Sequence, residues 1–96
     1  MKEDHRLKKK SIPQNLVPYT EKQGQYLAFI YHYTKINRCP PAERDMQRFF
    51  RVSPPSVHRM LIDLEKKKHI SRVPGQPRTI TVLLYLDQLP ILLDVN

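Results

Sequence analysis

Small polar and cationic side chains gather in one short stretch of this chain, where together they could contact a nucleic acid. The predicted contacts in this stretch are Ser53, Pro55, Ser56, His58 and Arg59. A guanidinium pairs bidentately with guanine O6 and N7, and hydroxyl groups donate to base edges or phosphates. Arg59 is therefore the predicted base reader. The alternative for Arg59 is a salt bridge to Asp63 on the same helix face.

Further predicted contacts, four arginines and one glutamine, lie on either side of this stretch. The predicted contacts outside it are Arg44, Arg48, Arg72, Gln76 and Arg78. The chain has 96 residues and carries 17 lysines and arginines against 9 aspartates and glutamates, a formal net charge of +8. A positive charge of this size attracts polyanions, although it does not determine a fold. We therefore expect double-stranded DNA as the partner.

Catalytic and metal-binding chemistry have no comparable cluster of residues. The histidines are scattered, and Cys39, the only cysteine, has no second thiol with which to form a disulfide or a zinc site. With only 2 glycines, the chain has no glycine-rich phosphate-binding loop. We expect no enzymatic activity, no metal and no cofactor.

The expected location follows from the same composition. No apolar run is long enough to cross a bilayer, and the polar start of the chain lacks the apolar stretch of a secretory signal. A single cysteine fits a reducing compartment. We therefore expect a cytoplasmic protein without membrane contact.

Hydrophobic spacing predicts the helices that would carry these side chains. Thr20 and Gln23 have the spacing of a capping box, which predicts a helix over residues 20–37. Gly24 lies inside this helix, where glycine costs about 1 kcal/mol relative to alanine, so we expect close packing or fraying there. A shorter helix is expected over 42–50. Its buried side is predicted to hold Met46, Phe49 and Phe50.

A third helix begins at the clearest local signal in the chain. Ser53 is a typical N-cap residue, and Pro54 follows at the first helical position, where its missing N–H costs nothing. We expect this helix to end near Lys68. Its inward-facing residues are predicted to be Val57, Leu61 and Leu64.

Two β-strands are predicted after the helices. Residues 69–73 and 78–84 are rich in β-branched side chains, and the second run alternates apolar with polar residues. The turn residues 74–77 join the runs as a hairpin with an exposed tip. Three helices and a small hairpin predict a mainly α fold, the three-helix winged helix-turn-helix. In that fold the third helix enters the major groove and the hairpin tip meets phosphates.

Composition divides the chain into three parts. Residues 1–18 mix charges with prolines and are expected to form a mobile basic arm. Residues 19–84 hold the winged helix-turn-helix, and residues 85–96 form an apolar C-terminal extension. This extension must cover something, either the helix over 20–37 or a second chain. A homodimer is therefore one of two expected outcomes.

Several short pieces of sequence carry a resemblance to a known family. They are Tyr19-Thr20-Glu21-Lys22-Gln23, Leu27-Ala28-Phe29-Ile30, Pro40-Pro41, Ser53-Pro54-Pro55-Ser56-Val57-His58, Leu64-Glu65-Lys66-Lys67 and Pro74-Gly75-Gln76-Pro77-Arg78-Thr79-Ile80. In this order and spacing they resemble the N-terminal DNA-binding domain of the LexA repressors. The resemblance implies a winged-helix repressor that reads palindromic operators. It also implies base contacts at the positions of Ser53, Pro55, Ser56, His58 and Arg59.

Three positions depart from the pattern of that family. Ala42 stands where a capping Ser or Thr is common, which removes a cap worth about 1 kcal/mol. Arg51 and Lys68 stand where the family has glycine, so they must adopt strained turns or alter them.

The self-cleaving Ser/Lys peptidase domain of the family does not follow the hairpin. We therefore expect no self-cleavage, and any dimerisation must come from elsewhere.

Two other functions are compatible with the fold. A winged helix can serve as a protein-interaction module, and a basic domain can bind nucleic acid without sequence preference. Protein interfaces are apolar at their centre, whereas the arginines here lie on the helices and hairpin that would face DNA. Sequence-specific DNA binding by a transcriptional regulator is therefore the leading prediction.

Overall fold

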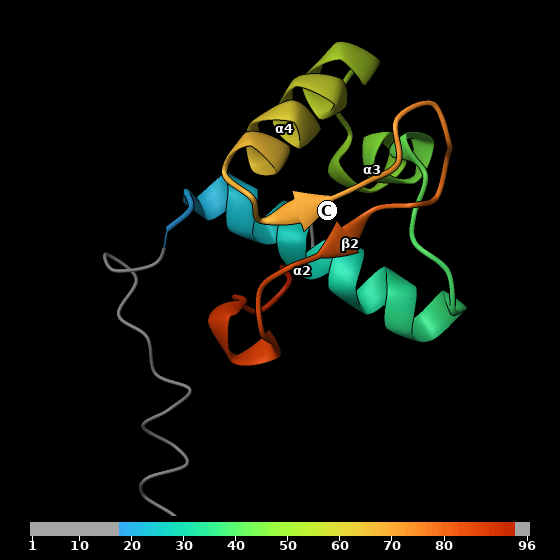
Figure 1. Ribbon diagram of the computed structural model, residues 1–96. Coiled ribbons are helices and arrows are strands. Elements are labelled where there is room, and N and C mark those ends of the chain that lie inside the picture. Colours follow the sequence, from blue (N-terminus) through green and yellow to red (C-terminus); the bar gives the residue numbers. More distant parts are fainter. Residues whose placement is uncertain (1–17, 94–96) are drawn as a thin grey trace, which may run out of the picture.

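The computed structural model describes residues 18–93, in which three α-helices precede a small antiparallel sheet (Figure 1). The helices are α2 (Glu21–Asn37), α3 (Glu43–Phe50) and α4 (Pro54–Lys66). Strands β1 (Ile70–Ser71) and β2 (Thr81–Val82) follow, and a short 3₁₀ helix, η2 (Leu86–Gln88), comes last. This architecture confirms the predicted winged helix-turn-helix. No helix in the described part of the chain is long and apolar enough to cross a membrane. Apart from Pro18, the predicted basic arm lies outside the described residues.

Helix α2 begins at the predicted capping box. The Thr20 hydroxyl accepts a hydrogen bond from Gln23 N at 3.1 Å, and Gln23 Oε1 accepts one from Thr20 N at 3.0 Å. The helix ends at Asn37 because Arg38 takes a left-handed backbone conformation with φ of 60°. Both predicted ends of this helix are confirmed.

The turns on either side of α3 and after α4 contain the three residues that depart from the family pattern. Ala42 offers no side-chain cap, but the Asp45 carboxylate accepts a hydrogen bond from Ala42 N at 2.8 Å, so half of a capping box remains. Arg51, after α3, and Lys68, after α4, adopt φ values of 56° and 62°. A left-handed backbone costs a residue other than glycine about 1–2 kcal/mol. The expected strained turns are therefore present.

Helix α4 is fixed at its start by its cap and along its length by its inner face. The Ser53 hydroxyl accepts a hydrogen bond from Ser56 N at 3.4 Å, and Pro54 occupies the first helical position, as predicted. The three predicted inward-facing residues have no exposed surface: Val57, Leu61 and Leu64. The helix ends at Lys66, slightly earlier than predicted.

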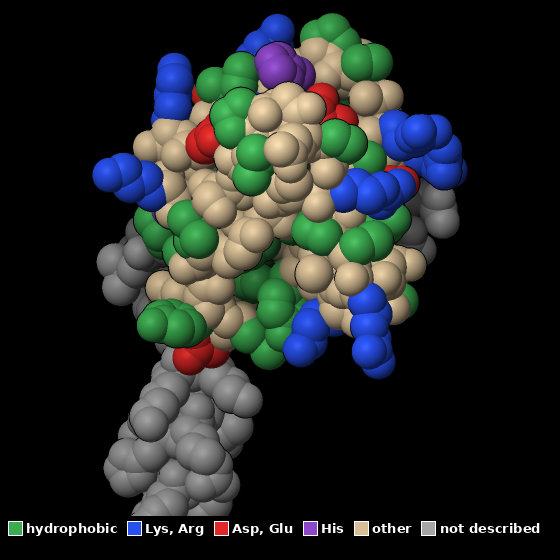
Figure 2. All heavy atoms as spheres, turned by 45° about the vertical axis from the view of Figure 1, so that its right-hand side comes forward, with side chains coloured by type: hydrophobic (Ala, Val, Ile, Leu, Met, Phe, Trp, Pro, Cys, Tyr) green, Lys and Arg blue, Asp and Glu red, His purple; other side chains and the backbone are tan. Residues whose placement is uncertain are grey.

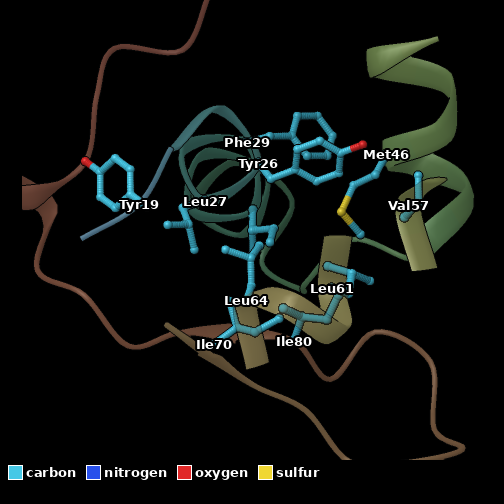
Figure 3. Close-up of a cluster of buried hydrophobic side chains, with 11 residues drawn as sticks. Tyr19, Tyr26, Leu27, Phe29, Met46, Val57, Leu61, Leu64, Ile70 and Ile80 are labelled. Atoms are coloured by element: carbon cyan, nitrogen blue, oxygen red, sulfur yellow. The ribbon is translucent and has the colours of Figure 1, made fainter. Parts of the chain in front are cut away.

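The hydrophobic core lies between α2 and the elements packed around it (Figure 3). Tyr26 and Leu27 of α2 belong to one buried cluster with Met46 of α3 and Leu61 of α4. The Tyr26 ring also stacks on the Phe50 ring, with 4.2 Å between centroids. Because the inner faces of α3 and α4 are buried in one cluster, their outer faces keep a defined mutual position.

The sheet is shorter than predicted. Strands were expected over 69–73 and 78–84, but Arg78 has φ of 59°, which no extended strand accommodates. Val73 N also donates to the Thr79 hydroxyl at 2.9 Å instead of to a strand carbonyl. Residues 72–80 consequently form a loop, which we call the wing. The antiparallel ladder consists of the pairs Ile70 with Val82 and Ser71 with Thr81.

The C-terminal segment, residues 83–93, packs along α2 on the side away from α4 (Figure 1). The Gln25 side chain donates to Ile91 O at 2.9 Å and accepts from Leu93 N at 2.8 Å. Leu84, Leu89 and Leu92 are half-buried against the core. The segment nevertheless keeps a set of exposed apolar side chains: Leu83, Tyr85, Leu86, Ile91 and Leu93.

Gly24 lies where this segment meets α2. A Cβ atom there would lie 2.7 Å from Tyr19 Cε1 and 3.0 Å from Pro90 Cγ. The Tyr19 hydroxyl in turn donates to the Gln88 carbonyl. Of the two expectations for this glycine, close packing is the one realised.

Candidate nucleic-acid interface

The outer side of α4 presents the side chains that were predicted to read bases. Of the five, Ser56 is half-buried and the others are exposed: Ser53, Pro55, His58 and Arg59. The hydroxyls of Ser53 and Ser56 lie 3.0 Å apart at the start of the helix. Packing of the opposite helix face against α2 and α3 points these groups outward from a rigid support.

Arg59 lies in a shallow depression at the junction of α2 and α4. Lys22 of α2 and Asp63 of α4 line the same depression. Within the described residues Arg59 forms no ion pair, so the alternative salt bridge to Asp63 is not made. All its guanidinium donors therefore remain available to an external acceptor.

His58 stands on the side of α4 that faces α3. Its Nδ1 atom lies 3.8 Å from Oε2 of Glu43, and the two side chains are 60% and 40% exposed. A pair this exposed contributes little to stability. The imidazole of His58 thus lies beside α3 and is still accessible from outside.

Arg44 and Arg48 extend from the exposed face of α3. Among residues 18–93 neither of them forms an ion pair. In Figure 2, which turns α3 and the wing towards the viewer, lysine and arginine side chains project around the rim of a largely uncharged centre. This distribution suits contacts with phosphates on either side of a groove.

Arg72 differs from these two arginines because carboxylates surround it. Its Nε donates to Glu65 of α4 at 3.1 Å, and its Nη1 lies 3.5 Å from Oε2 of Glu43 of α3. The side chain is only 18% exposed. Arg72 therefore joins the first half of the wing to both helices of the helix-turn-helix.

Arg78 is likewise engaged within the protein. Its Nη1 donates to the Tyr33 hydroxyl at 3.1 Å and to Pro40 O at 3.3 Å, and lies 3.2 Å from Oδ2 of Asp45. The hydrogen bond to Tyr33 raises the pKa of this guanidinium above its already high ordinary value. Arg78 thus connects the second half of the wing to α2, to the loop before α3 and to α3 itself.

A groove between the wing, α3 and α4 brings several predicted residues together. Four of the predicted contacts line it: His58, Arg72, Gln76 and Arg78. Glu43 and Glu65 line it as well, and sequence reasoning missed both, along with Tyr33 and Asp45. Acidic residues at Glu43 and Asp45 had an ordinary explanation at the start of a helix, so nothing in the sequence marked them as partners of distant arginines.

Comparison with known proteins finds one family and several relatives that match most of this chain. The chain matches the family described as the LexA DNA binding domain over residues 17–79. LexA repressors of three bacteria are similar to it: Thermotoga petrophila, 41% identical over 63 residues, Thermosipho melanesiensis, 39% over 64, and Petrotoga mobilis, 43% over 54. The matched parts are 66%, 67% and 55% of this chain, but 32%, 32% and 26% of those relatives. The chain thus spans about a third of the length of the first two of these curated relatives.

Proposed function

The chain belongs to the family of LexA DNA-binding domains, and we propose that it binds double-stranded DNA sequence-specifically as a transcriptional repressor. The observation that carries the proposal is the outer side of α4, where exposed Ser53, His58 and Arg59 stand on a helix whose inner face is buried. A helix of this kind fits the major groove, whose base edges display a distinct pattern for every base pair. The domain is a regulator domain, and we assign it no catalytic step.

Recognition divides between two groups of side chains. Arg59 reads a guanine edge, and Ser53, Ser56 and His58 contribute shorter donors beside it. Arg44 and Arg48 on α3 and Gln76 at the wing contact the backbone on either side, which sets register without reading sequence. Chromosomal DNA as the partner agrees with the cytoplasmic location expected from the single cysteine.

The electrostatic part of binding has a measurable signature. If roughly three to five phosphates are neutralised, log K falls with log salt at a slope of about −3 to −4.5. Duplex preference comes from the helix in the groove, because single strands offer no major groove.

Selection from a random duplex pool tests the proposal. The full chain is bound to the pool, bound molecules are amplified over several rounds, and affinity for the enriched duplex is compared with that for its separate strands. We expect an enriched motif, at least about tenfold preference over scrambled duplex, and weaker binding of the strands. A pool that stays random, or equal affinity for duplex and strand, contradicts sequence-specific reading.

We also propose that two copies associate through the C-terminal segment. The support is the exposed apolar surface formed by five of its side chains: Leu83, Tyr85, Leu86, Ile91 and Leu93. A small domain with apolar groups this exposed tends to bury them in an interface. This surface is also what the alternative function, protein interaction, would use. The C-terminal segment that carries it lies on the side of α2 away from α4, so association and DNA binding need not compete (Figure 1).

A further inference from the structure

Besides the buried side chain of Ile80, two arginines attach the wing to the rest of the domain, one near each end. Arg72 reaches Glu43, and Arg78 reaches Asp45. Both carboxylates belong to the first turn of α3, the helix that packs against α4. The wing and α4 thus both contact the same short helix, α3.

Arg78 contacts more parts of the fold than Arg72 does. One of its nitrogens contacts acceptors from three different parts of the fold: Tyr33 of α2, Pro40 of the loop and Asp45 of α3. Its backbone is left-handed, a conformation that a side chain with Cβ rarely adopts. Strain of this kind persists where surrounding contacts hold it, and these three acceptors supply such contacts.

Asp45 has further partners within the fold besides Arg78. Its Oδ2 accepts the hydrogen bond from Ala42 N at 2.8 Å and lies 3.2 Å from Arg78 Nη1, and the side chain is only 14% exposed. Burial tends to raise the pKa of this carboxyl, but the Ala42 hydrogen bond, the Arg78 charge, a hydrogen bond from Tyr33 and the Arg48 charge together outweigh it and lower the pKa below its ordinary value. The carboxylate is therefore charged whenever the domain is folded near neutral pH.

We propose that Arg78 and Asp45 form a clamp that fixes the position of the wing relative to α4, and that Arg78 supports DNA binding as a positioning residue more than as a phosphate ligand. The inference rests on the proposed DNA binding and deepens it. The Asp45 carboxylate, 3.2 Å away, offsets part of the charge of Arg78, whose side chain is 41% exposed, so Arg78 releases fewer phosphate counterions than an unpaired arginine does. Arg44 and Arg48, which form no ion pair with the described residues, carry that role.

The variant Asp45→Asn separates the two roles of Arg78, because they predict effects of opposite sign. Asparagine keeps an oxygen for Ala42 N but removes the charge that holds Arg78. If Arg78 is mainly a phosphate ligand, losing a nearby negative charge frees it and tightens DNA binding. If Asp45 and Arg78 are a clamp, the wing loosens and affinity for the selected duplex falls by about tenfold.

Two further variants make the result specific. Asp87→Asn removes an exposed carboxylate from the C-terminal segment, away from α4 and the clamp, so it should leave DNA binding unchanged. Tyr33→Phe removes the hydroxyl that accepts from Arg78 and hydrogen-bonds Asp45, without any change of charge, and should weaken binding by about threefold. Thermal unfolding of each variant establishes that the domain is folded at the binding temperature.

Hydrogen exchange supplies the readout that general destabilisation does not give. In Asp45→Asn, amides of residues 72–80 should exchange faster while those of the buried face of α4 keep their protection. Unchanged or tighter duplex binding by Asp45→Asn overturns the clamp, and so does faster exchange throughout the domain. Failure of the unaltered protein to prefer duplex overturns the proposed function instead, which keeps the two failures distinct.

Discussion

The arginines predicted to contact DNA have different surroundings in the folded domain. Arg44 and Arg48 project from α3, whereas Arg72 and Arg78 are held by carboxylates. This difference matters for binding to a polyanion, because an arginine already paired within the protein releases fewer counterions on binding than an unpaired one does.

Substitutions on α3 should therefore act through the salt dependence of binding. Arg44→Gln and Arg48→Gln should each reduce the slope of log K against log salt by about one unit, equally on selected and scrambled duplex. Lys35→Gln, at the far end of α2, is the control and should leave the slope unchanged. The measurement is a binding titration at several salt concentrations. An unchanged slope in both α3 variants would remove these arginines from the interface.

The Asp45 carboxyl makes the stability of the domain pH-dependent. Its folded-state pKa is lowered, so its contribution to stability is complete above the ordinary aspartate value of about 3.9 and is lost as pH falls through the folded value. Urea unfolding should show the unaltered protein more stable than Asp45→Asn at neutral pH, with the gap closing below about pH 4. A gap of constant size over that range would show that charge on Asp45 adds nothing.

For single residues, the sequence predicted which side chains of α4 face outward, but it did not predict which arginines are paired with carboxylates. Periodicity placed Val57 and Leu61 inside, and exposure of Arg59 followed from the same helix geometry. The partners of Arg78, by contrast, are Tyr33 and Asp45, which are distant in the chain and meet it only after the wing folds back. No local pattern encodes such a meeting.

Local signals were strongest at the beginnings of the helices. The capping pair of Thr20 and Gln23 and the Ser53-Pro54 start both involve residues a few positions apart, and both are formed as predicted. The strands were overestimated because β-branched composition favours extended backbone, while Arg78 and its contacts bend the chain away from it. Tertiary contacts decided the extent of the sheet.

Gly24 offers a test of packing between elements. Alanine is the better helix former by about 1 kcal/mol, but its Cβ would meet the Tyr19 ring at 2.7 Å. That ring is 8% exposed and its hydroxyl is bonded to Gln88, so it has little room to move. We expect Gly24→Ala to lose about 1 kcal/mol net in urea unfolding, since overpacking costs about 1–3 kcal/mol. A variant more stable than the unaltered protein would mean that Tyr19 and residues 83–93 move aside at little energetic cost.

At the scale of the whole molecule, α4 and the C-terminal segment lie on different sides of α2 (Figure 1). A two-fold pair formed through residues 83–93 would therefore direct its two α4 helices away from each other. Such a pair would hold two duplex segments, in contrast to dimers that place two helices in one palindromic site. The arrangement of the surfaces sets what a dimer of this kind can do.

Association through that surface should depend on its most exposed side chains. Tyr85 and Ile91 are 79% and 82% exposed, so replacing both with serine should leave the fold intact while abolishing concentration-dependent dimerisation in sedimentation. Substitution is a cleaner test than truncation, because truncation would also remove the contacts of Gln25 with Ile91 and Leu93. A monomeric unaltered protein at all concentrations would contradict this association.

The central claim is that α4 reads sequence through Arg59, and one comparison tests it most directly. Affinities of the unaltered protein and of Arg59→Ala are measured on the selected duplex and on a scrambled duplex of the same length and composition. Loss of a bidentate guanine contact should cost about 1–3 kcal/mol on the selected duplex, relax preference at one base position, and leave the scrambled duplex nearly unaffected. The ratio of specific to non-specific affinity should therefore fall about tenfold or more. A ratio that Arg59→Ala leaves unchanged would contradict the assignment of α4 as the reading helix.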